Sequence, residues 1–497
     1  MKVILSGYNI DTEVIKEAEN AGIPKERLTP EVLSAAYARI SRNPAPVNEL
    51  RQMALNEVAK ARKSNKNIIF GMGHHSVAEH AAFNFDIIDM SRLAIEELEH
   101  FRLCSFTEKS QRYITLNNDY VMPAELETTP FKDDLENLIK KQAEIYNSLH
   151  DKLHSILIDK HPELQLKKSD ANMVDGWAKE DARYATLLCT AGQLGFTANA
   201  RNLELIIKRL NASKLQELKD LAEAFYEKVK DVAPSIFLFT EPSDYDTKTP
   251  ALLTELANSF FEKDFNSGEL EKDALLHNYT KNGDQIIAAS LLASASSKPF
   301  EDCLNIVNNL SLDGILNIFK TALSNMEFFD SPPREFEHAS LTFEVSVSAA
   351  AYGQLKRHRM MTQTISDYAP SLGLTIPPSI VDAGLEEQFR KHAKDAEELF
   401  YKIREPLPHI APYVLTNAHR RRVLITVNVR DLYHFSRLRE DAHAQWDIRI
   451  LAALLRKETE NVMPAASILL CGKDSYVERF TSVYNKAPQI DPSNPKG

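Results

Sequence analysis

The chain repeats itself on the scale of a whole domain, and this internal repeat limits its possible folds more than any other feature. The residues Glu79–Asp86 (EHAAFNFD) match Glu337–Glu344 (EHASLTFE) in order, and both alternate apolar and polar residues. Such alternation is typical of a half-buried strand. A helical pattern follows each of them, over Ser91–Phe101 and Ser348–Lys356. Self-similarity over so long a stretch predicts that one structural unit occurs twice.

The repeat continues to the end of each half. Amphipathic helices are predicted at Asp133–Leu153 and at Glu386–Arg404. A strand carrying Asn-x-Arg and a closing helix that ends at a proline follow in both halves. The asparagine-to-proline distance is 35 residues in the first half and 36 in the second. These landmarks are Asn199-Ala200-Arg201 with Pro234, and Asn428-Val429-Arg430 with Pro464.

We therefore predict two tandem α+β domains, each a small central sheet flanked by helices. The first domain is residues 1–243 and the second is residues 250–480, followed by a tail at 481–497. The segment Glu241–Pro250, polar and with two prolines, is the predicted linker. The first half carries an extra segment near Ile156–Lys179.

Composition excludes several classes of protein. Of the 497 residues 43% are hydrophobic and 26% are charged, which is typical of a soluble globular protein. The net charge of −11 argues against broad nucleic-acid affinity. The four cysteines are far apart and form no CxxC pair, so we expect no disulfide framework, no zinc site and a cytoplasmic location. No apolar run suggests a signal peptide or a membrane span.

Several polar motifs admit both a structural and a functional interpretation. Arg357-His358-Arg359 fits a solvated basic corner, but guanidinium groups also match phosphate oxygens. Ser105–Tyr113 is either a surface loop or a cradle for a polar ligand. His74–His80 invites a metal, but its spacing departs from the zincin pattern, so we expect none. We interpret Arg420-Arg421-Arg422 as solvated charge at a strand edge.

These motifs resemble those of flavin-dependent thymidylate synthases, whose signature is RHRxxSxNExSxRY. The first half, His100–Tyr113, keeps the tail of this signature apart from Thr107 in place of Asn, and lacks the Arg-His head. The second half keeps the head at Arg357-His358-Arg359 and lacks the Glu and Arg of the tail. The family's closing motif, NAR…LR…HAQWEI, occurs in the second half and ends in His443–Ile448, whereas the first half keeps only its NAR.

The losses in the two halves are complementary. Members of the family are homotetramers whose subunits share active sites, so the resemblance implies two residue sets per site. The first half keeps one set: Glu108, Ser110, Arg112, Tyr113 and Arg183, with His74, Ser76 and Glu79 on the flavin side. The second half keeps the other: Gln354, Arg357, His358, Arg359, Arg439 and His443. Random decay would scatter losses over both sets, so we expect a composite site.

The sequence leaves one equivalence open. Glu97 and Phe101 stand opposite Gln354 and His358. Counting from the first-half asparagine, Asn199, puts Leu210 opposite Arg439. Counting back from the closing proline puts Arg209 there instead.

The resemblance implies reductive methylation of dUMP to dTMP, with FAD as cofactor, methylenetetrahydrofolate as carbon donor and NADPH as reductant. Arg112 and Arg439 are the candidate catalytic residues. The resemblance implies that substrate is held by Glu108, Ser110, Arg112, Tyr113, Arg183, Gln354 and Arg439. It implies that FAD is held by His74, Ser76, Glu79, Asn199, Arg201, Arg357, His358, Arg359, His434 and His443.

Two alternatives remain at this point. One is a related flavoenzyme that acts on another pyrimidine nucleotide, because a fold and a site do not set the substrate. The other is a non-catalytic flavin- or nucleotide-binding pseudoenzyme. Because the family tetramer holds four copies of the domain, we also expect two chains to form a homodimer with pseudo-tetrameric symmetry.

Overall fold

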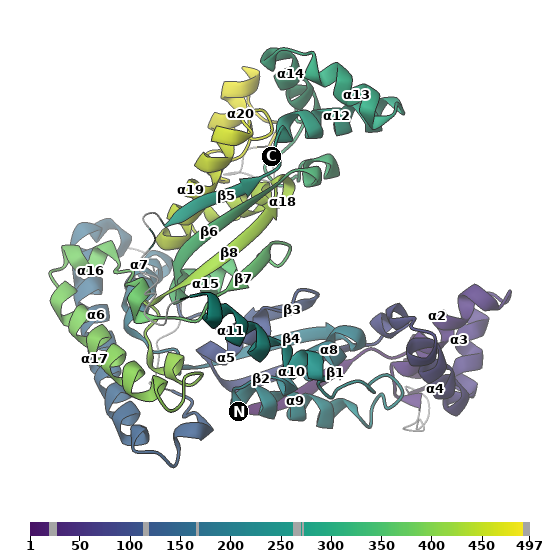
Figure 1. Cartoon of the computed structure of the whole chain (residues 1–497), viewed down its shortest axis with the longest axis horizontal. Helices are drawn as coiled ribbons and strands as arrows, with labels where there is room; N and C mark the ends of the chain where they lie inside the picture. Colours follow the sequence, from purple (N-terminus) through teal and green to yellow (C-terminus); the bar gives the residue numbers. More distant parts are fainter. Residues whose placement is uncertain (19–26, 113–118, 166–167, 262–269, 271–272, 491–497) are drawn as a thin grey trace. The chain divides into compact units, whose positions relative to one another are not determined.

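Two four-stranded antiparallel sheets carry the two repeats, and their strand orders are equivalent. The sheets run β1-β2-β4-β3 and β5-β6-β8-β7, so each strand of the first has a counterpart in the second. This match confirms the predicted architecture of two tandem α+β domains, seen in Figure 1, which shows the computed structural model. The strands are β1 (Lys2–Tyr8), β2 (Ala82–Ser91), β3 (Cys104–Glu108), β4 (Ala191–Asn199), β5 (Ala274–Tyr279), β6 (Ser340–Ser348), β7 (Thr362–Ile365) and β8 (Arg420–Asn428).

The structure describes the chain except for residues 19–26, 113–118, 166–167, 262–269, 271–272 and 491–497. It divides into two compact units that do not coincide with the two repeats. The first unit is Met1–Phe265 with Pro378–Thr416, and the second unit is Asn266–Pro377 with Asn417–Gly497. The segment Pro378–Thr416 belongs to the second repeat but packs in the first unit. The domain boundaries predicted above follow the repeats and stay a prediction.

Alternating side chains build one core face on each sheet. In the first unit Phe83 and Phe85 of β2 are buried, whereas Asn84 between them is exposed. Helix α9 (Gln216–Val229) covers this face, and its Phe225 ring centroid lies 4.8 Å from that of Phe85. In the second unit β6 alternates in the same way, with Leu341, Phe343 and Val345 fully buried in the core. The half-buried pattern that the sequence predicted is therefore the basis of both cores.

The remaining helices flank the sheets or form separate layers (Figure 1). In the first unit they are α1 (Thr12–Ala18), α2 (Glu31–Arg39), α3 (Val47–Asn56), α4 (Val58–Lys66), α5 (Arg92–Glu99), α6 (Phe131–Lys160), α7 (Lys168–Ala182), α8 (Ala200–Asn211), α10 (Asp244–Thr247), α11 (Thr249–Phe260), α16 (Pro378–Asp382) and α17 (Glu386–Arg404). In the second they are α12 (Gly283–Ser296), α13 (Phe300–Asn308), α14 (Leu312–Ala322), α15 (Ala349–Leu355), α18 (Val429–Arg439), α19 (Trp446–Val462) and α20 (Tyr476–Tyr484). Among the described residues, none of these helices combines the length and apolar character that a bilayer span requires.

Equivalent segments of the two repeats pair with each other inside the first unit. The two predicted amphipathic helices are α6 and α17, which pack together and are joined by an ion pair of 2.7 Å between Lys141 and Asp395. Beyond them Leu187 and Thr416, at equivalent positions, form an antiparallel bridge. A patch that pairs with its own counterpart is the arrangement of a two-fold dimer interface. The extra segment of the first half forms the end of α6 and most of α7, against which α6 packs.

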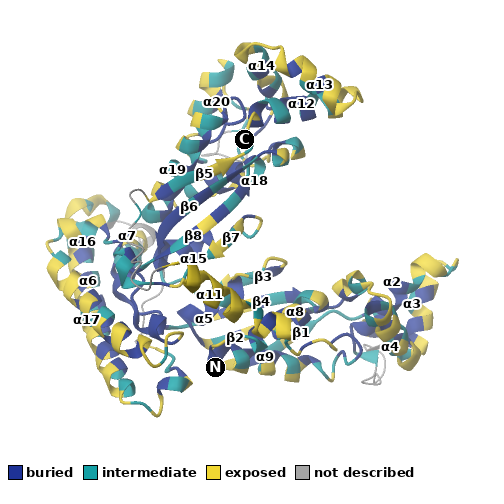
Figure 2. Ribbon diagram, viewed as in Figure 1, coloured by how far each residue is buried: buried dark blue, intermediate teal, exposed yellow. Residues whose placement is uncertain are grey.

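Four local expectations need adjustment. The Glu-His pairs precede their strands, in the 3-10 helices η4 (His75–His80) and η8 (Arg334–His338). Asn199 ends its strand, and Ala200 and Arg201 begin a helix rather than continue the strand. The predicted linker is partly helical, and α11, which begins in it, is exposed along its length (Figure 2). Helix α20 extends into the predicted tail, whose last part, residues 491–497, lies outside the described residues.

The interpretation of Arg420-Arg421-Arg422 as solvated charge at a strand edge is wrong. These residues begin β8, which lies between β6 and β7 in the interior of the second sheet. Arg421 is only 3% exposed, and the other two are half-buried. Three consecutive arginines therefore suggested a solvated surface although one of them is buried. All four cysteines, by contrast, are free and buried, in line with the expected absence of disulfides.

Candidate active site

A buried charged triad lies at the end of β3 in the first unit. Arg92 is the first residue of α5, a helix that the side chain of Ser91 caps. Its guanidinium contacts Glu108 at 2.9 Å and Glu96 at 3.1 Å. The side chains of the three are 7% exposed or less. The sequence indicated Glu108 but missed its partners, although Arg92 and Glu96 have the i, i+4 spacing of a helical ion pair.

A second charged group lies nearby and joins Arg112, which follows β3, to Glu180 of α7 and Arg183 of the 3-10 helix after it. The guanidinium of Arg112 pairs with the carboxylate of Glu180, and Arg183 Nε donates to the Glu180 carbonyl oxygen at 3.2 Å. Burial lowers the pKa of Arg183, and the positive charges of Arg92 and Arg112 lower it further. Arginine stays protonated in proteins, so these three guanidinium groups bring three positive charges close together. Glu180 is a second partner that sequence reasoning missed.

Two residues of the triad, Arg92 and Glu108, line a small cavity with room for about one water molecule. Ser110, a predicted substrate residue, is part of its wall, and its Oγ accepts a hydrogen bond from the Arg112 backbone at 3.2 Å. The cavity, hereafter the β3 cavity, is lined by Arg92, Ile95, Glu108, Lys109, Ser110, Gln111, Thr190, Ala191 and Gly192. Tyr113, also predicted to contact substrate, lies outside the described residues.

The predicted flavin-side residues lie on another surface of the first unit. His74, Ser76 and Glu79 are exposed in and beside η4. Glu79 forms an ion pair with Arg201, and both side chains are exposed. The structure therefore does not bring these residues into the β3 cavity.

Two of the residues assigned to cofactor binding have structural partners that recur in both repeats. Asn199 caps α8 by accepting from Asn202 N at 3.0 Å, and Asn428 caps α18 in the same way. The ion pair of Arg201 with Glu79 has its counterpart between Arg430 and Glu337, 3.3 Å apart. Asparagine is a favoured cap because its side-chain oxygen satisfies a free helical N–H group. These contacts explain why both repeats retain the Asn-x-Arg motif.

In the second unit three predicted residues form one hydrogen-bonded network. Arg439 Nε donates to His358 Nε2 at 2.8 Å. Two further nitrogens of Arg439 donate to the side-chain and backbone oxygens of Gln354, at 3.3 and 3.4 Å. Both partners of Arg439 are buried, at 7% exposure each. The structure thus brings together residues that the sequence grouped only by resemblance.

The histidine of this network is held neutral. Burial lowers the pKa of His358 well below its usual range, and the nearby charge of Arg439 lowers it further. A neutral imidazole has one acceptor nitrogen. Because Nε2 accepts from Arg439, the proton is assigned to Nδ1. The Phe435 ring packs edge-on against the imidazole with the centroids 4.7 Å apart.

The other predicted cofactor residues of the second repeat differ in exposure and in their distance from this network. Arg357 is exposed and Arg359 is half-buried, next to the buried His358. The ring of His434 lies 5.8 Å from that of His358, and burial lowers the pKa of His434. His443 is 90% exposed at its side chain and contacts Asp441 at 2.8 Å. Arg357 and Arg359, the neighbours of His358 in the chain, thus form a basic rim that is at least partly exposed.

The helix caps decide the open equivalence of Arg439. Both α8 and α18 begin directly after their capping asparagines and run without interruption, so Leu210 stands opposite Arg439. Leu210 is buried in the core, 3% exposed. Arg209 is half-exposed and lies 3.5 Å from Asp246. The first repeat consequently has no arginine at the position that organises the network in the second.

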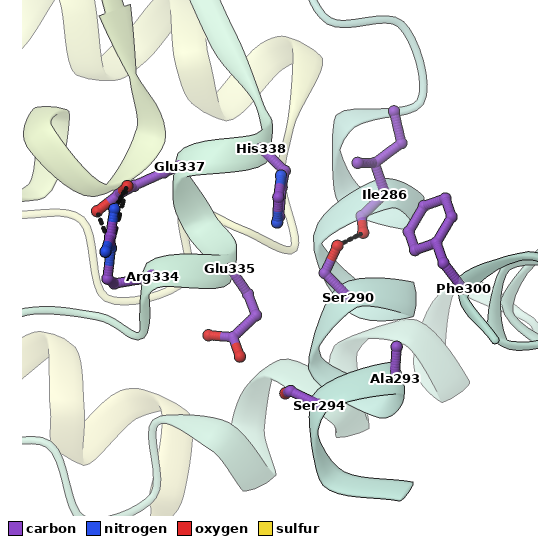
Figure 3. Close-up of a pocket in the computed structure, with 9 residues that line it drawn as sticks. All are labelled: Ile286, Ser290, Ala293, Ser294, Phe300, Arg334, Glu335, Glu337 and His338. Atoms are coloured by element: carbon purple, nitrogen blue, oxygen red, sulfur yellow. Dashed lines mark hydrogen bonds and ion pairs between the residues drawn. The ribbon is translucent and has the colours of Figure 1, made fainter. Parts of the chain in front are cut away.

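A larger hollow lies in the second unit, away from the residues predicted from the sequence. It separates α12 from η8, and its walls include Phe300, Glu335 and His338 (Figure 3). Arg334, one of its residues, pairs with Glu337 at 3.0 Å. In the sequence this wall corresponds to the flavin-side segment of the first repeat, with Arg334 opposite Ser76.

The chain matches one protein family twice. Residues 25–235 and 275–465 each match the family described as thymidylate synthase complementing protein. A UPF0159 protein of Chlamydia muridarum (strain MoPn / Nigg) is 26% identical over 426 residues, which are 82% of this chain and 80% of that protein. A flavin-dependent thymidylate synthase of Clostridium tetani (strain Massachusetts / E88) is 29% identical over 225 residues, or 44% of this chain and 86% of that protein.

Two solved structures also match about half of the chain. The crystal structure of thymidylate synthase X from Helicobacter pylori, with FAD and dUMP, is 20% identical, and the match covers 48% of this chain and 97% of that chain with a TM-score of 0.27. A UMP/dUMP methylase from Streptomyces cacaoi, bound with 5-Br dUMP, is 19% identical, and the match covers 44% of this chain and 100% of that chain with a TM-score of 0.31.

Proposed function

This chain belongs to the family of thymidylate synthase complementing proteins, and from this membership we propose that it is a flavin-dependent thymidylate synthase. The enzyme replaces the hydrogen at C5 of dUMP with a methyl group. Methylenetetrahydrofolate supplies the carbon, NADPH supplies the reducing equivalents, and the C5 hydrogen leaves as a proton. The products are dTMP, tetrahydrofolate and NADP⁺.

The first repeat supplies the anion-binding part of the site. A nucleotide phosphate is a dianion that guanidinium forks and hydroxyls recognise. Arg112 and Arg183 lie together around Glu180, and Ser110 lies beside them. In this proposal the phosphate or sugar of dUMP binds to this group, and Arg112 exchanges its ion pair with Glu180 for the substrate.

The second repeat supplies the part that acts on the base. Negative charge develops on the uracil carbonyl when C5 becomes a nucleophile, and a fixed cation beside that oxygen stabilises it. Arg439 is the candidate, because His358 and Gln354 hold its guanidinium in a set orientation. A neutral His358 is suited to this task, since it accepts a hydrogen bond from Arg439 without adding positive charge.

The basic rim of the second repeat fits FAD. A diphosphate requires cationic donors that ligand can reach, and Arg357 is exposed while Arg359 is half-buried. His74, Ser76 and Glu79 of the first repeat are exposed as well and are proposed to contact the cofactor from another side. FAD, when bound, supplies the hydride and redox chemistry of the reaction.

One observation carries this proposal: each repeat retains one of two chemically different residue sets. The network of Arg439, His358 and Gln354 belongs to the second repeat, whereas Leu210, Phe101 and Glu97 occupy these positions in the first. The first repeat in turn has Arg183 where the second has Pro412. A decayed pseudoenzyme would not divide its losses in this way. We therefore propose a composite site, with both repeats required for one complete set and two chains forming a homodimer.

Tritium release from [5-³H]dUMP tests the proposed reaction. Purified protein with FAD, methylenetetrahydrofolate and NADPH is expected to release tritium to water and to form dTMP. Release that needs NADPH but is faster with [5-³H]UMP would move the assignment to another pyrimidine nucleotide. Protein that binds FAD and dUMP yet releases no tritium with either nucleotide would contradict the enzyme assignment and leave a binding protein.

A further inference from the structure

The β3 cavity of the first repeat has a counterpart in the second, because the two sheets have the same register. Gly192 of β4 lies opposite Met90 of β2, and Arg421 of β8 lies opposite Val347 of β6. Both positions stand at the same distance before the capping asparagines of their strands. Arg421 is therefore the structural equivalent of Gly192.

The other walls of the cavity can be matched in the same way. Strands β3 and β7 pair with β4 and β8 in equivalent registers, ending at Glu108 and Ile365. The residues that follow are thereby aligned, and so are those after the helix caps Ser91 and Ser348. The wall residues Ile95, Lys109 and Gln111 of the first repeat correspond to Tyr352, Ser366 and Tyr368 of the second.

In the second repeat, Arg421 is held by these three equivalent residues. Its guanidinium carbon lies 4.8 Å from the ring centroid of Tyr352 and 4.3 Å from that of Tyr368. Its Nε donates to the Ser366 carbonyl oxygen at 2.8 Å. Arginine between two aromatic faces is a favourable cation–π arrangement, and this side chain is 3% exposed. The position that is a cavity wall in one repeat thus carries a well-held side chain in the other.

The first repeat depends on glycine for this space. A Cβ atom added to Gly192 would lie 2.6 Å from Ile95 Cδ1, on the opposite wall of the cavity. Any longer side chain at this position would have to enter the cavity or displace its wall. Because Cδ1 is the end of a side chain, Ile95 can shift to admit a larger residue, and the substitution then costs cavity space; no positive φ adds backbone strain at Gly192.

We propose that Arg421 is an internal plug that closes the second repeat's copy of the β3 cavity. Gly192 leaves the first repeat's copy unfilled, so each chain presents one cavity of this kind, beside the arginines proposed to hold the nucleotide. The identification of the ligand as dUMP rests on the proposed function. Two features would then keep a nucleotide out of the second repeat: it lacks the arginines that would bind the nucleotide, and the side chain of Arg421 fills the space.

Transplanting the plug tests the proposal. The variant Gly192→Arg/Ile95→Tyr/Gln111→Tyr gives the first repeat the arrangement of the second. Its Kd for dUMP, measured by equilibrium dialysis, is expected to rise more than about 100-fold, because a built-in clash excludes the ligand. FAD content is expected to stay that of the wild type. A folded variant that binds dUMP as tightly as the wild type would overturn the proposal.

Removing the plug gives a test that needs neither nucleotide nor activity. Arg421→Gly leaves a slot between Tyr352 and Tyr368, and millimolar methylguanidinium is expected to bind there and raise the Tm of this variant but not of the wild type. No difference between the two proteins would contradict the plug. If the wild type binds no dUMP, the proposed function fails while this result still decides the role of Arg421.

Discussion

The two repeats share their backbone supports and differ in the chemistry attached to them. Both cap equivalent helices, α8 and α18, with Asn199 or Asn428, and both begin an earlier helix, α5 or α15, with a capping serine. That serine hydrogen bonds to a carboxylate in each repeat: Ser91 Oγ to Glu217 and Ser348 Oγ to Asp447. What both repeats retain therefore supports the fold, and what only one retains is the candidate for function.

The contrast is sharpest around the β3 cavity. In the first repeat Arg92, Glu96 and Glu108 form a buried charged triad. The equivalent residues in the second repeat are Ala349, Gly353 and Ile365, and the space beside them is filled by Arg421. One scaffold thus supports a charged cavity in one copy and a filled core in the other. A duplicated domain can divide its tasks in this way because the backbone does not depend on either filling.

The largest expected effect comes from removing the arginine that only the second repeat has. Arg439→Ala leaves His358 and Gln354 without their shared donor and is expected to lower dUMP-dependent turnover by about 100- to 1,000-fold. Arg209→Ala is the matched control, because this exposed arginine directly precedes Leu210, the residue of the first repeat that is equivalent to Arg439. Turnover is measured as kcat/KM by tritium release. Equal losses in the two variants would contradict the assignment of this role to the second repeat alone.

A double variant with one substitution in each repeat tests whether both arginines serve the same site. Arg112→Ala in the first repeat is expected to reduce turnover as well, since it removes a proposed contact to dUMP. If both arginines serve one composite site, the double variant Arg112→Ala/Arg439→Ala loses less than the product of the single losses. Independent sites in each repeat would instead leave each single variant with a large share of the wild-type rate.

The buried triad gives the next effect, on stability. Arg92→Ala removes the guanidinium that the buried carboxylates of Glu96 and Glu108 both contact and is expected to lower the free energy of unfolding by about 3–5 kcal/mol. Replacing all three by apolar residues, as in Arg92→Ala/Glu96→Ala/Glu108→Ile, is expected to cost less, because the second repeat folds with such residues. Urea unfolding measures both, and a triple variant less stable than the single one would contradict this account.

A smaller effect concerns pH. The pKa of His358 is lowered in the folded protein, so the unfolded chain binds the proton more readily. The stability contributed by neutral His358 is therefore full above its ordinary value near 6.5 and is lost as pH falls below it, by at most about 1.4 kcal/mol per pH unit. His358→Gln keeps an acceptor for Arg439 but does not titrate. A wild type and variant with the same slope of unfolding free energy between pH 7.5 and 5.5, roughly the range over which histidine titrates, would exclude this role.

Sequence patterns predicted the features that depend on local order. The strand alternation and the helices α6 and α17 follow from residues in fixed spacing, whereas the grouping of Gln354 with His358 and Arg439 came from the family resemblance. The burial of Arg421 could not be predicted, because a run of three arginines carries no sign of the tyrosines that enclose one of them. The same holds for α17, whose apolar face predicts burial but not its partner α6.

The triad shows the same limit in another form. Arg92 and Glu96 could have been found as a helical pair, but their contact with Glu108 depends on how β3 is placed beside α5. The signal from Glu108 came only from the family motif. Long-range packing, rather than local propensity, thus separates the predicted residues of this site from the missed ones.

The smallest expected effect tests whether the two capping asparagines are equivalent. Asn199 accepts from Asn202 N at 3.0 Å and Asn428 accepts from Asp431 N at 2.8 Å. Replacing either by Ala removes one cap and is expected to lower the free energy of unfolding by about 1 kcal/mol, while Asp, an equally good cap, restores it. If Asn199 serves only the helix, Asn199→Asp retains wild-type FAD content and turnover. A variant Asn199→Asp that is as stable as the wild type but loses FAD would show that this asparagine also contacts the cofactor. Asn428→Asp gives the same comparison of stability and FAD content for the second repeat. The pair thereby separates support of the fold from binding at a position where both repeats carry the same residue.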